Sequence, residues 1–80
     1  MGKSTDLDKA FGEALRELRL AKNLTQEQLG FEAGLRRTFI SSLELGEKQP
    51  SLSTIKKIAD VFGLSISKLL QRVEDKLKKG

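Results

Sequence analysis

The chain has 80 residues, which is enough for one small domain and too few for a second hydrophobic core. It contains neither cysteine nor histidine, so disulfides are excluded and the usual metal ligands and the usual general base are missing. We therefore expect no metal, no cofactor and no enzymatic activity. The net charge of +4 is compatible with a polyanionic partner. No apolar run approaches the roughly 18–20 residues of a membrane span, so we expect a cytoplasmic protein without membrane contact.

Apolar residues recur at helical spacing along the chain, and no stretch alternates with the period of two that marks a strand. The first helix is expected from about Asp6 to Lys22. Its apolar stripe contains Leu7, Phe11, Ala14, Leu15, Leu18 and Ala21. Acidic residues near its start and basic residues near its end suit the helix dipole.

Two short helices are expected next. Thr25 and Gln28 have the spacing of a capping box and predict a helix from Gln26 to about Ala33. Gly34 follows, at the position where a left-handed residue ends a helix. A third helix is expected from about Arg36 to Leu45, with Gly46 behind it and an apolar side made of Phe39, Ile40 and Leu43.

The remaining chain predicts two more helices. Ser51 is a cap for the fourth, which contains Leu52, Ile55, Ile58, Ala59 and Phe62. Ser65 caps a fifth, from Ile66 to about Leu77. The fold class is therefore an all-α, compact five-helix domain. We expect an N-terminal arm and helix start in residues 1–10, the domain in 11–70, and the helix end with a basic tail in 71–80.

Residues 25–46 have the pattern of a helix-turn-helix, in which two short helices cross at about 90–120°. Gly30, Ala33 and Gly34 supply small residues where the backbones approach. A glycine inside a helix costs about 1 kcal/mol relative to alanine, so Gly30 indicates close packing, with a tolerated weak spot as the alternative.

The outer side of the third helix is polar in an unusual way. Arg37, Thr38, Ser41 and Ser42 lie opposite Ile40 and Leu43, where a solvated helix more often carries Glu and Lys. Arg can pair with guanine O6 and N7, and Ser and Thr are adaptable partners of base edges. The alternative for the two serines is that they are exposed polar residues without a function, but the neighbouring Arg36-Arg37 favours contact with DNA. We expect base contacts from these four residues.

From Phe11 to Leu69 the chain resembles the Cro/phage-repressor (XRE-like) helix-turn-helix family. The resemblance is carried by LRELRLAKNLTQEQLGFEAGL, RRTFISSLELGEKQPSLSTIKKIADVFGLS and SKLL. Within that family, AGLRRTFISSLELGEKQPS is most similar to the controller proteins of restriction–modification systems. The resemblance implies a lambda-repressor-like fold and a sequence-specific DNA-binding transcriptional regulator.

The resemblance also implies roles for single residues. Arg19 and Glu44 match an ion pair inside the fold, and Gln26 matches a residue that reaches a phosphate and braces the recognition helix. The further phosphate-contact positions are Thr25, Arg36, Lys48, Gln49 and Ser51. Three positions depart from the family. Arg36 stands where the family usually has a Ser or Thr cap, and Leu45 stands where it often has an Arg. Phe39 replaces the Tyr that is common in controllers. We expect its side chain to pack, with a contact to a thymine methyl or a sugar as the alternative.

One such domain makes few base contacts, so we expect a homodimer on a near-palindromic operator, with recognition helices about 34 Å apart in double-stranded DNA. The fifth helix has a wide apolar face, which we interpret as the dimer interface or, alternatively, as cover for the core of the monomer. It consists of Ile66, Leu69, Leu70 and Val73. RNA polymerase is left open as a partner, through Glu27 or Glu32. The alternative function is an antitoxin-type protein-binding module that also binds its own operator.

Overall fold

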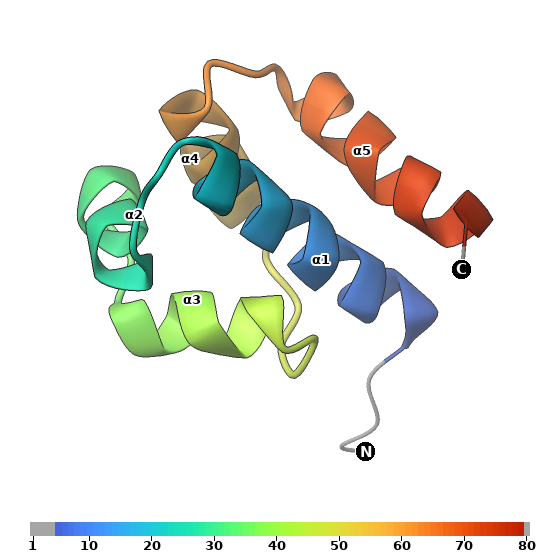
Figure 1. The fold of residues 1–80 in the computed structure, drawn as a ribbon, viewed down its shortest axis with the longest axis horizontal. Coiled ribbons are helices and arrows are strands. Elements are labelled where there is room, and N and C mark those ends of the chain that lie inside the picture. The colour runs from blue at the N-terminus through green and yellow to red at the C-terminus, as the bar shows by residue number, and fades with distance from the viewer. Residues whose placement is uncertain (1–4, 80) are drawn as a thin grey trace.

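The computed structural model describes residues 5–79, and all secondary structure within them is helical. The five helices are α1 (Asp6–Ala21), α2 (Gln26–Ala33), α3 (Arg37–Glu44), α4 (Leu52–Val61) and α5 (Ile66–Lys79). In Figure 1, α1 runs through the middle, with α5 above it and α3 below, and it packs against both. The predicted all-α, five-helix fold is confirmed. No helix within residues 5–79 is long and apolar enough to cross a membrane.

Local capping chemistry explains where the helices begin and end. The hydroxyl of Thr25 accepts the N–H of Gln28 at 3.0 Å, and the Gln28 side chain accepts the N–H of Thr25 at 2.8 Å. Gly34 ends α2 with a φ of 71°, the left-handed conformation that was predicted. A second capping box, between Thr5 and Asp8 at the start of α1, was not predicted. α5 ends at Lys79, two residues beyond the predicted end at about Leu77.

A single core joins the five helices. Its fully buried large side chains come from every helix and are Leu15, Leu29, Ile40, Leu43, Ile58 and Leu69. Phe39 is half-buried and packs against this core, as expected. The interpretation of α5 needs a correction, because Leu69 is 0% exposed and Val73 is 2% exposed. Both side chains therefore belong mainly to the core of the monomer.

Two glycines allow backbones to approach the ends of the motif helices. A Cβ atom on Gly30 would lie 2.5 Å from the carbonyl oxygen of Leu35, so the predicted close packing at Gly30 is present. A Cβ atom on Gly12 would lie 2.5 Å from the carbonyl oxygens of both Leu43 and Glu44. The last turn of α3 therefore rests directly on the backbone of α1, a contact that the sequence did not reveal.

Candidate nucleic-acid interface

The outer face of α3 is polar. Ile40 and Leu43 are completely buried on the inner side of this helix. On the other side, Arg37 and Thr38 are exposed and Ser41 and Ser42 are half-buried. Figure 1 shows α3 at the edge of the molecule, with no other element below it. The four predicted base-contact residues are thus on a helix that is free to enter a groove about 12 Å wide.

A buried ion pair holds the end of α3 from behind. Nε and Nη2 of Arg19 donate hydrogen bonds to the two carboxylate oxygens of Glu44 at 2.6 and 3.0 Å. The two side chains are only 10% and 5% exposed. Nη1 of Arg19 donates to the carbonyl oxygen of Leu24 at 2.9 Å, which links the α1–α2 turn to the same pair. Bidentate geometry of this kind fixes orientation as well as contributing energy.

The carboxylate also stabilises the charged form of its partner. The hydrogen bond to Glu44 raises the pKa of Arg19 above its ordinary value, with a further contribution from the negative charge and against the effect of burial. Arg19 therefore carries its positive charge throughout the neutral range. Glu44 is a structural residue and does not belong to the polar outer face of α3.

Gln26 connects α2 to this pair. Its amide nitrogen donates a hydrogen bond to the Glu44 carboxylate at 3.1 Å, and the side chain is half-buried. The bracing role that the resemblance implies for Gln26 therefore has a physical basis, since one carboxylate is bonded to both α1 and α2.

Three of the predicted phosphate-contact residues occupy the N-terminal caps of three helices. Thr25 precedes α2, Arg36 precedes α3 and Ser51 precedes α4. Helix N-termini carry partial positive charge and free N–H groups, which suit an anion. All three residues are exposed, and so are Lys48 and Gln49 in the loop before α4.

The cap of α3 is incomplete. The Arg36 side chain makes no capping hydrogen bond among the described residues, whereas the Ser51 hydroxyl accepts the N–H of Thr54 at 3.1 Å. The departure from Ser or Thr at Arg36 thus leaves α3 without a side-chain cap. A guanidinium cannot accept a hydrogen bond from a helix N–H, but it leaves a positive charge next to free N–H groups.

Two short helices joined by a tight turn, the second braced from behind and polar in front, define a helix-turn-helix protein. A family model described as Helix-turn-helix matches residues 15–69. The chain belongs to this family, in its Cro/phage-repressor form, whose members are DNA-binding transcriptional regulators.

Control proteins are among its relatives. Control protein C.BamHI of Bacillus amyloliquefaciens is 44% identical over 61 residues, which cover 75% of each chain. Control protein C.SmaI of Serratia marcescens is 40% identical over 67 residues, covering 84% of this chain and 80% of that protein. The crystal structure of the restriction-modification controller protein C.AhdI from Aeromonas hydrophila matches with a TM-score of 0.74 and 40% identity, over 78% of this chain and 94% of that one. The resemblance to controller proteins is confirmed.

Proposed function

We propose that this protein controls a restriction–modification operon by binding a near-palindromic operator as a homodimer. The observation that carries the proposal is the face of α3 that bears Arg37 and Thr38, which is exposed while the same helix is fixed from behind by Glu44. The sequence identity to control proteins supports the proposal that the regulated genes form a restriction–modification operon. It also favours a transcriptional regulator over an antitoxin-type module.

In the proposed complex, α3 enters the major groove and Arg37, Thr38, Ser41 and Ser42 contact base edges. Thr25, Gln26, Arg36, Lys48, Gln49 and Ser51 contact phosphates on either side, and this orients the helix. When the protein occupies its operator on the nucleoid, it represses transcription by covering a promoter. Activation is the second outcome, through an exposed surface on α2 that RNA polymerase contacts. That surface comprises Glu27, Glu32 and the 87% exposed Phe31.

The homodimer is proposed because one α3 reads too few base pairs to select a genomic site. Since Leu69 and Val73 lie mainly in the core, most of the apolar α5 surface that can face a partner belongs to Ile66 and Leu70, which are half-buried. Sedimentation at high micromolar concentration tests this, and a monomer there would contradict it.

Selection of bound DNA from a random library, with the wild type and two variants, tests the assignment of roles. The wild type is expected to enrich one palindromic motif. Arg37→Ala should cost about 1–3 kcal/mol and relax one position in each half-site, because it removes a base contact. Lys48→Ala should weaken binding to all sequences alike, because it removes a phosphate contact. It should also reduce the slope of log affinity against log salt concentration by about one. No enriched motif would refute the function, and exchanged phenotypes would refute the roles.

A further inference from the structure

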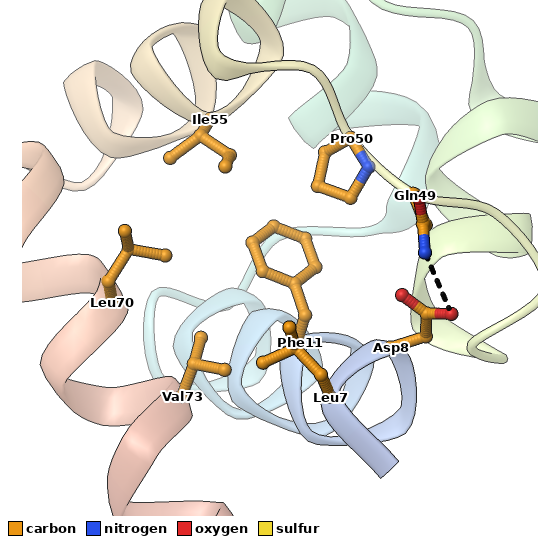
Figure 2. A pocket seen from close by; sticks show the side chains of 8 residues that line it. All are labelled: Leu7, Asp8, Phe11, Gln49, Pro50, Ile55, Leu70 and Val73. Carbon is orange, nitrogen blue, oxygen red and sulfur yellow. Dashed lines mark hydrogen bonds between the residues drawn. The ribbon is translucent and has the colours of Figure 1, made fainter. Parts of the chain in front are cut away.

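An apolar pocket of about 230 Å³ opens on the side of the molecule between α1, α4 and α5. Figure 2 shows the Phe11 ring at its centre, with Ile55, Leu70 and Val73 on one side and Pro50 on the other. The polar lining consists of Asp8 and Gln49, whose side chains approach each other at 3.5 Å. Pro50 and Gln49 belong to the loop that carries the proposed phosphate contacts, so the pocket lies directly behind that loop.

The volume of the pocket suits one aliphatic side chain. An engineered cavity of about 150 Å³ already holds benzene, whereas drug-sized ligands occupy roughly 300 Å³ or more. The pocket therefore has room for a leucine side chain and some adjustment around it. Since the lining is mainly carbon, an apolar occupant is favoured over a polar one.

The same face of the protein carries projecting leucines. Leu52, the first residue of α4, is 71% exposed and lies two residues after Pro50. It also lies one helical turn before Ile55, on the same side of α4. Leu7, which lines the pocket at its α1 side, is 56% exposed. A cavity and a projecting apolar side chain on one surface are what a twofold interface between identical chains requires.

The dimensions of the molecule agree with contact through this face. The principal extents are 28 × 26 × 22 Å, so two copies in contact have centres that are closer together than the about 34 Å between successive major grooves. Each α3 must therefore lie farther from the contact than the centre of its own copy does. All the residues that line the described pocket come from α1, α4, α5 and the loop before α4, which leaves α3 clear of a partner there.

We infer that the pocket receives Leu52 of the partner subunit, and reciprocally, so that dimerisation completes the phosphate-contact loop. In the monomer, the Gln49–Pro50 wall has an open cavity behind it. In the dimer, a leucine fills this cavity and packs against Pro50, which fixes the loop in the position from which Lys48 and Ser51 reach DNA. The inference rests on the proposed homodimer and adds the residue that joins the two copies.

Analytical ultracentrifugation of three forms tests the inference. Leu52→Lys should raise the dimer dissociation constant about a hundredfold, because a buried leucine is lost twice in a twofold dimer. Leu20→Lys is the matched control, since Leu20 is 52% exposed on α1 and does not line the pocket. It should leave the dissociation constant unchanged. Because Leu52 is exposed in the monomer, both variants should keep the wild-type melting temperature at concentrations low enough that all three forms are monomeric.

Cross-linking gives a second readout, since the natural sequence contains no cysteine. A mixture of the Leu52→Cys and Leu7→Cys variants should form a disulfide-linked pair, and a mixture of Leu52→Cys and Leu20→Cys should not. Hydrogen exchange of the amides of residues 47–49 and 51 should slow with concentration in the wild type and not in Leu52→Lys.

The outcomes separate the two proposals. A wild type that is monomeric at high micromolar concentration overturns the homodimer and the inference with it. A dimeric wild type that Leu52→Lys leaves intact overturns the pocket alone. A dimer that dissociates without any change in the loop exchange overturns the coupling to DNA contact.

Discussion

Replacing Glu44 by leucine removes the acceptor of three hydrogen bonds, two from Arg19 and one from Gln26. The guanidinium that remains is 10% exposed and still charged, because no neutral form of arginine is accessible. We expect Glu44→Leu to destabilise the protein severely, through an uncompensated buried charge and not through the loss of packing volume.

The expected loss of stability can be compared with the total free energy of unfolding. Breaking a buried ion pair by removing one partner costs about 3–5 kcal/mol. A chain of 80 residues has a free energy of unfolding of about 4–12 kcal/mol. Glu44→Leu should therefore remove between about a quarter and all of the free energy of unfolding. Arg19→Met should cost a similar amount, because it leaves the carboxylate with Gln26 alone.

The double variant distinguishes this mechanism from simple loss of contacts. Arg19→Met with Glu44→Leu removes both charges, and such apolar replacements are often neutral or stabilising by about 1–4 kcal/mol. Its stability should therefore exceed that of either single variant, although operator affinity should fall because Gln26 no longer holds α3. Urea unfolding followed by far-UV circular dichroism measures this, since the chain has neither Trp nor Tyr. Costs of the single changes that add up in the double variant would refute the reasoning.

Three further substitutions follow from the geometry of the motif. Gly30→Ala should lower the free energy of unfolding by about 1–3 kcal/mol, because its Cβ would lie 2.5 Å from the Leu35 oxygen; a gain in urea unfolding would contradict the close approach. Arg36→Ser should add about 0.5–2 kcal/mol by capping α3 but weaken operator binding, and thermal melts with salt titrations separate the two effects. Leu45→Arg, at a position that is 63% exposed, should tighten binding and raise the salt dependence by about one charge; an unchanged slope would place Leu45 away from the phosphates.

Features set by neighbours in the chain could be predicted from the sequence. The Thr25–Gln28 box, the left-handed Gly34 and the Ser51 cap depend on a few adjacent residues, and all three are present. The buried Arg19–Glu44 pair is different, because only the family resemblance pointed to a contact between residues 25 positions apart.

Features set by the packing of helices could not be predicted. The apolar spacing of α5 gives the direction in which Leu69 and Val73 point, but it cannot tell a core from a partner surface. Gly12 is an ordinary residue of α1 until α3 rests on it. The pocket behind Pro50 likewise arises from three helices that meet at one loop, and no single segment of the sequence contains it.

The two sides of α3 have different roles because this helix is not stable by itself. Eight residues without a side-chain cap are too few to form a stable helix alone. Its position therefore depends on contacts made behind it, through Ile40, Leu43 and Glu44, and on the bare backbone of Gly12. Because those contacts lie on one side of the helix, the exposed side chains of Arg37 and Thr38 contribute little to the stability of the fold. Exchanges there should alter which operator is bound while leaving the fold intact.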